Sequence, residues 1–199
     1  MNKLISLLIM VCIGLSCYAQ DIALPSPNKT GGKPLMDALN DRRTTREFSD
    51  KELDVQTLSD LLWAAYGFNR ENMRVVPSAN NKQEFTVYVV LKTGVYVYDA
   101  QENLLILKVS GDWREKAGKQ DFVATAPLNL VYVADLKITS KETAGVDVGF
   151  IAQNVYLYCA SVGLGTVVRG WFDGDEIKTA FGLDANQTPI LTQTVGYKK

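Results

Sequence analysis

Residues 128–134 read Leu-Asn-Leu-Val-Tyr-Val-Ala, a nearly unbroken apolar run late in the chain. This composition is typical of a strand buried on both faces, because a strand with one wet face alternates apolar and polar residues. Two more β-branched and aromatic runs come earlier, at 85–91 and 94–98, and Lys92-Thr93-Gly94 at their junction predicts a hairpin. The sequence therefore predicts a sheet whose middle strand is covered on both faces.

Stretches with helical spacing surround these strands. Asp54 is placed to cap a helix that Gly67 ends, and apolar residues three and four apart predict a long helix over 143–162. The long helix is apolar on more than one side, which is typical of a central helix or of one at a subunit interface. Shorter helices are predicted at 34–40, 112–119 and 173–181, and more strands at 103–109, 166–168 and 189–195. This mixed order predicts an α+β layer fold.

The composition excludes several kinds of chemistry. The chain has 199 residues, of which 47% are hydrophobic, and it contains no histidine. Without histidine there can be no Ser-His-Asp triad, no Cys-His dyad and no histidine-ligated zinc. Lys and Arg number 21 against 22 Asp and Glu, so no bulk charge attracts nucleic acid or an anionic membrane. We therefore expect a single packed domain with no metal site and no nucleic-acid partner.

Residues 1–19 have the pattern of a secretory signal peptide. A basic start precedes an apolar run at 4–15, and small residues follow up to Ala19. We expect cleavage after Ala19 or Gln20 and export to the periplasm, because the run is too short to span a membrane. Lipid anchoring through Cys17 is the alternative, and a buried N-terminal helix is a third interpretation.

Residues 20–34 contain three prolines and two glycines and little apolar pattern. They are expected to form an extended N-terminal tail, which could pack on another subunit. The folded domain is then expected to cover residues 35–199. After removal of the signal peptide Cys159 would be the single cysteine, so no internal disulfide is expected.

Three segments could carry function. Residues 42–46 include three arginines and two threonines, and arginine forks and hydroxyl groups match phosphate oxygens. A loop of small residues at 75–81 would let backbone groups approach a flat ligand closely. The third segment is 163–173, where Gly170 breaks a strand at a point that a ligand could approach closely. Each segment taken alone is more often an ordinary turn.

In their order along the chain, these segments resemble the FMN-dependent nitroreductase family. Residues 42–48 are similar to the family's Arg-x-Ser-x-Arg-x-Phe start, with Thr44 at the serine position. Other stretches that resemble the family are 61–67, the Pro-Ser-rich loop at 77–83, 126–127, 147–154, 163–165 and 195–197. The helix around Trp63 and the strand at 94–98 look closest to the branch that includes azoline-forming dehydrogenases.

The resemblance implies a three-layer α+β fold with a central mixed, mostly antiparallel sheet flanked by helices. It also implies a homodimer with two FMN sites at the subunit interface. The phosphate and ribityl chain would be held by Arg42, Arg43, Thr44 and Arg46, with Lys198 as a further basic residue. The flavin would be lined from the partner subunit by Pro77, Ser78, Ala79 and Asn81, and the backbone at Arg169 and Gly170 would face its N5 and O4 atoms.

The function implied by the resemblance is that of an FMN-dependent oxidoreductase, with ping-pong hydride transfer through flavin N5 to a nitroaromatic, quinone or similar small substrate. The flavin carries this chemistry, so no catalytic side chain is assigned, which suits a chain without histidine. A non-enzymatic periplasmic protein that binds flavin or another ligand on the same fold is the alternative. A structural protein with relict motifs is the third interpretation. An exported location leaves the electron donor open.

Overall fold

The apolar run at 128–134 forms the middle of the observed sheet. In the computed structural model, which describes residues 20–199, β7 (Leu128–Asp135) pairs antiparallel with both β4 (Phe85–Leu91) and β9 (Gln187–Tyr197). The other strands of the sheet are β1 (Ile22–Ala23), β5 (Gly94–Asp99), β6 (Leu104–Ser110) and β8 (Leu164–Arg169). The strand order is β1-β6-β5-β4-β7-β9-β8, and each neighbouring pair is antiparallel. The predicted, mostly antiparallel central sheet is confirmed.

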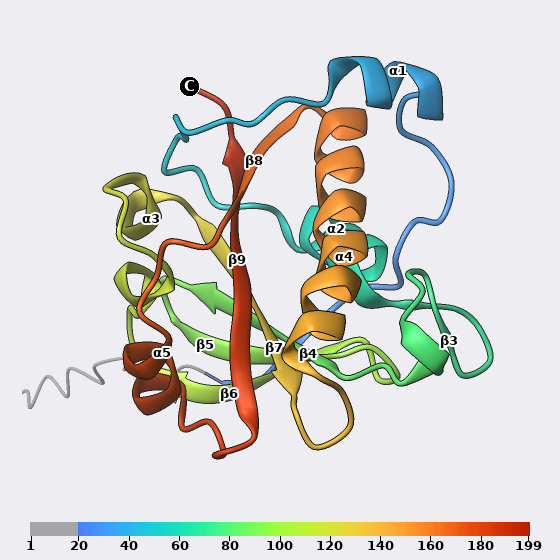
Figure 1. The fold of residues 1–199 in the computed structure, drawn as a ribbon. Helices are drawn as coiled ribbons and strands as arrows, with labels where there is room; N and C mark the ends of the chain where they lie inside the picture. The colour runs from blue at the N-terminus through green and yellow to red at the C-terminus, as the bar shows by residue number, and fades with distance from the viewer. Residues whose placement is uncertain (1–19) are drawn as a thin grey trace, which may run out of the picture.

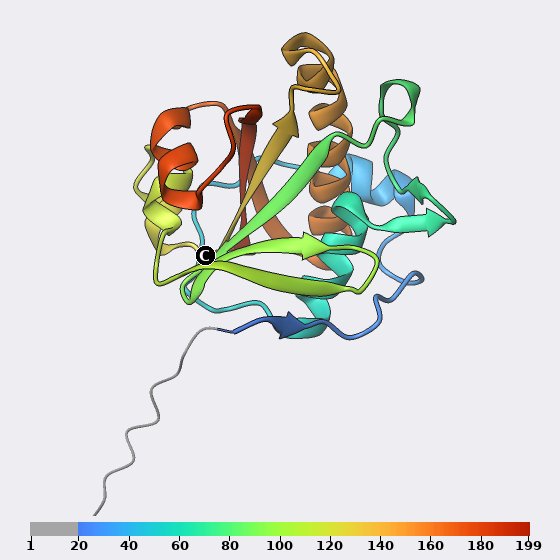
Figure 2. The same cartoon turned by 90° about the horizontal axis from the view of Figure 1, so that it is seen from below.

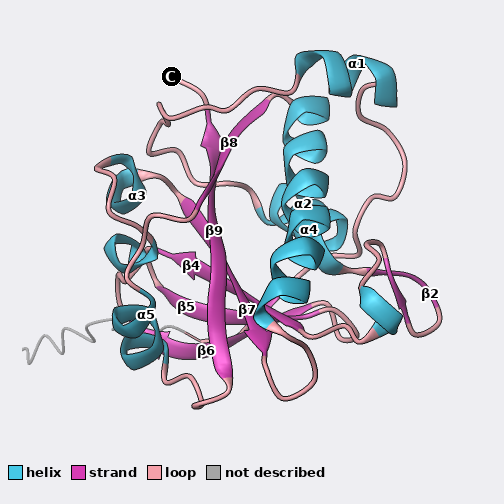
Figure 3. Ribbon diagram, in the orientation of Figure 1, coloured by secondary structure: helices cyan, strands magenta, loops and turns pink. Residues whose placement is uncertain are grey.

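Helices cover the sheet on both faces (Figures 1 and 3). One face carries α2 (Val55–Tyr66) and α4 (Lys141–Val162), and α1 (Leu35–Asp41) packs against α4. The opposite face carries α3 (Phe122–Thr125), α5 (Gly174–Phe181) and the short 3₁₀ helix η2 (Arg114–Ala117). The predicted α+β layer fold with flanking helices is therefore confirmed.

Alternate side chains of β7 enter two separate cores, because successive residues of a strand point to opposite faces. Leu128, Leu130 and Tyr132 pack in the core beneath α2 and α4. Val131 and Val133 pack in the second core, beneath α5 and η2. All five side chains are at most 1% exposed, which explains why this strand lacks polar alternation.

Two predicted helix starts are confirmed by their capping hydrogen bonds. The Asp54 carboxylate accepts the Thr57 N–H at 2.9 Å at the start of α2, and Gly67 ends that helix. Asp173 accepts backbone N–H groups of Asp175 and Glu176 at the start of α5. Side-chain acceptors of this kind satisfy backbone donors that have no partner within the helix.

Several predicted bounds differ from the observed ones. The helix predicted at 112–119 is wrong in length, because only the single 3₁₀ turn η2 forms there. The last two strands are longer than predicted, since β8 and β9 continue pairing with each other up to Leu164 and Tyr197. A small hairpin of β2 (Phe68–Arg70) and β3 (Met73–Arg74) follows α2 and was not predicted.

The segment at 20–34 is extended and packs against the rest of the same chain. Ile22 pairs with Leu105, so β1 forms one edge of the sheet beside β6 (Figure 2). Farther along, the Ser59 hydroxyl donates to the Pro25 carbonyl, and the Asn28 N–H donates to Asp60 at 2.7 Å. The tail thus packs along β6 and α2. The predicted signal peptide at 1–19, with its alternative anchor at Cys17, lies outside the described residues.

Within residues 20–199, no helix combines the length and apolar character that a membrane crossing requires.

Candidate functional site

Residues 42–48 run along the exposed edge of β8 and reach the C-terminal end of β9. The Thr45 N–H donates to the Thr166 carbonyl at 2.9 Å, and Thr44 forms an isolated parallel bridge with Thr166. Three residues later Phe48 bridges Lys198 in antiparallel fashion. These contacts bring the arginine-rich segment and the last lysines to one edge of the sheet (Figure 1). We call this set of Arg42, Arg43, Thr44, Arg46 and Lys198 the basic edge.

The cationic side chains of the basic edge form no ion pair with a carboxylate of residues 20–199. Arg43, Arg46 and Lys198 are exposed and Arg42 is half-buried. The neighbouring Asp41 pairs instead with Lys33, at 2.5 Å, and this contact lowers the pKa of the Asp41 carboxyl. A cluster of unpaired guanidinium and ammonium groups is suited to hold an anion such as a phosphate.

Tyr156 of α4 is a part of this site that the sequence analysis missed. Its hydroxyl lies 3.1 Å from the Thr44 hydroxyl and accepts the Val168 N–H, also at 3.1 Å. The Arg42 guanidinium lies over its ring, 5.3 Å from the centroid. Tyr156 therefore ties the basic edge to α4 and β8. One feature of the sequence could have indicated this role. A tyrosine on the buried side of the long helix carries a hydroxyl group, and a buried hydroxyl needs hydrogen-bond partners.

Gly165 in β8 permits the close approach of the basic edge. A Cβ atom at this position would lie 2.8 Å from Thr45 Cγ2 and 3.1 Å from Lys198 Cγ. Any larger residue would push these two neighbours away from the strand. Gly165 therefore lets the segment that carries the basic edge pack tightly against β8.

The small-residue loop at 77–81 is held by side chains on both of its sides. The Ala79 N–H donates to the Asp147 carboxylate of α4 at 2.8 Å, and Ser78 Oγ accepts the Gln83 N–H at 2.9 Å. Asn80 and Asn81 have φ angles of 54° and 53°, in the left-handed region that asparagine tolerates better than most residues. The loop is thus a fixed, tightly curved structure whose Pro77 and Asn81 are exposed.

Within one chain, this loop and the basic edge do not meet. The loop contacts α4 at Asp147, whereas the basic edge contacts it at Tyr156. Nine residues of helix separate these two points by about 13 Å. The structure therefore brings Arg42, Arg43, Thr44, Arg46 and Lys198 together, and places Pro77, Ser78, Ala79 and Asn81 apart from them.

A buried carboxylate pair lies behind the loop and was also missed. Glu84 is 3% exposed and Asp147 is 4% exposed. Neither carboxylate oxygen of Glu84 has a hydrogen-bond partner among the described residues. Burial raises the pKa of Glu84 above its usual value near 4.5, and the neighbouring Asp147 raises it further. Burying an ionised carboxylate without a partner is costly, so folding shifts the protonation equilibrium of Glu84 toward the neutral form.

Replacing Glu84 with glutamine should therefore stabilise the protein in a pH-dependent manner. Because the folded-state pKa of Glu84 is raised, its contribution to stability is lost as the pH rises through that pKa. Glutamine cannot ionise, so the free energy of unfolding of Glu84→Gln should exceed that of the unaltered protein at about pH 8. The excess should shrink as the pH falls toward about 4.5.

Urea denaturation at several pH values measures this difference. Glu115→Gln is the matched control, because the Glu115 side chain is 67% exposed and should show no such trend. An excess that stays constant across the pH range would contradict a raised pKa for the buried Glu84 carboxyl.

Arg169 and Gly170 occupy the end of β8 and the position after it. The Arg169 side chain is 5% exposed, and it donates to the Ala117 carbonyl at 3.1 Å and to Asn129 Oδ1 at 3.0 Å. Burial lowers the pKa of its guanidinium to about 10. The side chain therefore joins β8 to η2 and β7, while Gly170 is exposed and leaves its backbone open to a ligand.

These features define a class of protein: a helix-covered, antiparallel α+β sheet with an uncompensated basic edge beside the C-terminal strand. Within that class, the chain belongs to the nitroreductase family, whose sequence model matches residues 39–197. A candidate nitroreductase from Methanocaldococcus jannaschii is 34% identical over 182 residues, which cover 82% of this chain and 91% of the relative.

Solved structures share the same fold. A candidate nitroreductase from Ralstonia eutropha has a TM-score of 0.85 and 41% identity, with 92% of this chain and 91% of that chain covered. An FMN-dependent nitroreductase from Clostridium difficile has a TM-score of 0.60, with 82% of this chain and 87% of that chain covered. At 19% identity, this second likeness shows the fold alone. Together with the family match, these relatives support a nitroreductase-like oxidoreductase.

Proposed function

We propose that the protein is an FMN-dependent oxidoreductase that reduces a nitroaromatic, a quinone or a similar small substrate by a ping-pong mechanism. The observation that carries this proposal is the basic edge, where four cationic side chains meet without a carboxylate partner among the described residues. A phosphate group fits this donor set. A solved structure of the same fold is that of an FMN-dependent nitroreductase, which supports FMN as the phosphate-bearing cofactor.

In this proposal the basic edge holds the phosphate and ribityl chain. Guanidinium groups would each donate two parallel hydrogen bonds to phosphate oxygens, and Lys198 would add a point charge. Thr44 would donate its hydroxyl, which Tyr156 keeps in place from the side of α4. The residues assigned to this role are Arg42, Arg43, Thr44, Arg46 and Lys198.

The second half of each flavin site would come from a partner subunit. Because the loop at 77–81 lies away from the basic edge of its own chain, its residues Pro77, Ser78, Ala79 and Asn81 are proposed to line the flavin of a homodimer. Exposed apolar side chains on the packed helices α1 and α4 support such an interface. They are Leu35, Met36, Leu39, Val146, Phe150 and Val162.

The backbone at Arg169 and Gly170 is proposed to face N5 and O4 of the ring. Bound FMN would supply hydride transfer through N5, and a backbone donor at that atom would stabilise the reduced form. The buried Arg169 side chain fixes the end of β8, so the backbone there is held in position. No side chain needs to act as a nucleophile or as a base.

Export to the periplasm through a signal peptide at 1–19 is part of the proposal, as is membership in the branch with azoline-forming dehydrogenases. An exported enzyme would meet little NAD(P)H, so its electron donor has to be sought among other reductants as well.

A turnover assay tests the enzymatic part of the proposal. The protein loaded with FMN should reduce a nitroaromatic or a quinone with NADH, NADPH or a reduced mediator dye, with parallel double-reciprocal plots that indicate ping-pong kinetics. Protein that binds FMN but shows no turnover with any of these reductants would favour the non-enzymatic binding protein instead. The Arg70→Ala protein, altered at an exposed arginine outside the site, should retain the rate.

A further inference from the structure

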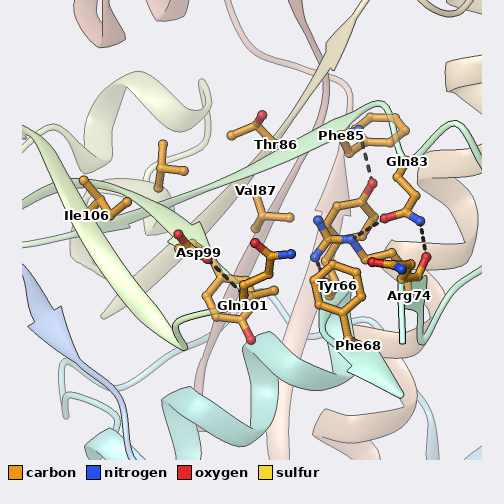
Figure 4. A pocket seen from close by; sticks show the side chains of 14 residues that line it. Tyr66, Phe68, Arg74, Gln83, Phe85, Thr86, Val87, Asp99, Gln101 and Ile106 are labelled. Atoms are coloured by element: carbon orange, nitrogen blue, oxygen red, sulfur yellow. Dashed lines mark hydrogen bonds between the residues drawn. The ribbon is translucent and has the colours of Figure 1, made fainter. Parts of the chain in front are cut away.

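A cavity lies between the β2–β3 hairpin and strands β4 and β5. Its volume is about 460 Å³, within the range of about 300–1,000 Å³ that is typical of small-molecule sites. The hairpin and the end of α2 form one wall, and strands β4 and β5 with the turn after β5 form the other (Figure 4). None of the residues assigned to FMN lines this cavity.

The distinctive group in this cavity is the guanidinium of Arg74. It lies between two aromatic rings, 4.3 Å from the Tyr66 centroid and 3.9 Å from the Phe68 centroid. Its Nε donates to Gln83 Oε1 at 3.1 Å and its Nη1 donates to the Tyr66 carbonyl at 2.8 Å. These contacts fix the orientation of the planar group in the cavity wall (Figure 4).

The remaining terminal nitrogen of Arg74, Nη2, has no hydrogen-bond acceptor among residues 20–199. No carboxylate of these residues lies within 4.0 Å of the guanidinium, so the charge is not neutralised by an ion pair. Asp99 lines the same cavity, but its Oδ1 accepts the Gln101 and Glu102 N–H groups of the turn. A half-buried cation with a free donor edge is therefore available to an anion.

We propose that this cavity binds a small organic carboxylate with a flat, apolar body. The free donors of Arg74 suit one carboxylate, and no second cation of the described chain lines the cavity to match the higher charge of a phosphate group. Tyr66, Phe68 and Tyr98 supply aromatic surface for the body of the ligand. The cavity shares no residue with the basic edge or with Pro77, Ser78, Ala79, Asn81, Arg169 and Gly170, and it borders the loop at 77–81 through Gln83, whose side-chain amide donates to Asn81 Oδ1 at 3.0 Å.

Binding of benzoate to the full chain tests this proposal, with benzamide as the neutral analogue of the same shape. Isothermal titration or ligand-observed NMR should show saturable benzoate binding and much weaker benzamide binding. Arg74→Gln should weaken benzoate binding at least about tenfold, because a charge-assisted hydrogen bond is lost. Arg70→Gln removes the same charge from an exposed position on the same hairpin and should leave the affinity unchanged.

A second variant keeps the test valid if Arg74→Gln does not fold. Gln101 is exposed and lines the cavity, so Gln101→Glu adds a competing negative charge without disturbing a buried contact. It should also weaken benzoate binding. The proposal is overturned if benzoate shows no saturable binding, if benzamide binds equally well, or if both folded variants bind benzoate as the unaltered chain does. Because binding is measured without flavin turnover, these outcomes do not depend on the proposed enzymatic function.

Discussion

Replacing Arg42 and Arg46 together with alanine is expected to weaken FMN binding by at least about 100-fold, because each change removes charge-assisted hydrogen bonds to the phosphate. Neither guanidinium makes an ion pair among the described residues, so its removal leaves no carboxylate unpaired. The fold should therefore persist. Fluorescence titration of FMN, which is quenched or enhanced on binding, measures the loss of affinity.

The matched control for this experiment is a double variant with the same charge change elsewhere. Arg70 and Lys92 are exposed and lie outside the basic edge, so Arg70→Ala/Lys92→Ala should bind FMN like the unaltered protein. Sedimentation analysis of both variants separates a lost phosphate contact from a lost dimer. Unchanged FMN affinity in the Arg42→Ala/Arg46→Ala variant would contradict the proposal that the basic edge binds the FMN phosphate.

The second large effect concerns the buried Arg169. Gly118 lies against its guanidinium, where a Cβ atom would collide with Nη1. That nitrogen is held by its hydrogen bond to the Ala117 carbonyl, so it cannot move away freely. Gly118→Ala should therefore destabilise the protein by about 2–3 kcal/mol, as is usual when an atom is forced into a packed interior.

A double-mutant cycle identifies the guanidinium as the cause. Arg169→Ala alone should cost about 3 kcal/mol, because it removes two charge-assisted hydrogen bonds and leaves a cavity. In that background, adding Gly118→Ala should cost less than about 1 kcal/mol, since the collision no longer occurs. Urea denaturation of the four proteins gives the coupling energy.

Gly145 provides the control for a glycine-to-alanine change. It lies inside α4 with nothing within 4 Å of an added Cβ, so Gly145→Ala should be neutral or stabilising. Additive costs of Gly118→Ala and Arg169→Ala would show that the two residues do not contact each other as described.

Much of the fold could be predicted because buried positions are occupied by apolar residues, so the pattern of residue types indicates which segments are buried. The run at 128–134 lacks polar alternation because both faces of this strand are covered. The strand was therefore predicted correctly from its composition. The β2–β3 hairpin was not predicted, because its short strands have no alternation and its turn contains Asn72, not glycine, at a positive φ of 56°. Strands of two or three residues are too short to show a hydrophobic periodicity that would predict them.

The site could be predicted in part, because residue type alone marks the arginines and threonines that suit a phosphate. What sequence could not supply was the set of contacts that hold these residues. Tyr156 lies 112 residues from Thr44, and Arg169 lies 52 and 40 residues from its partners Ala117 and Asn129. An arginine is rarely buried, so nothing in the local sequence indicated that the Arg169 side chain points into the interior.

The most direct test of the central claim is the visible absorption spectrum of the purified chain from Gln20 onward, recorded before and after addition of FMN and gel filtration. We expect a flavin band that either co-purifies with the protein or is retained after FMN is added, with FMN released on denaturation. A colourless protein that does not retain added FMN would contradict the account and would leave the basic edge without its proposed ligand.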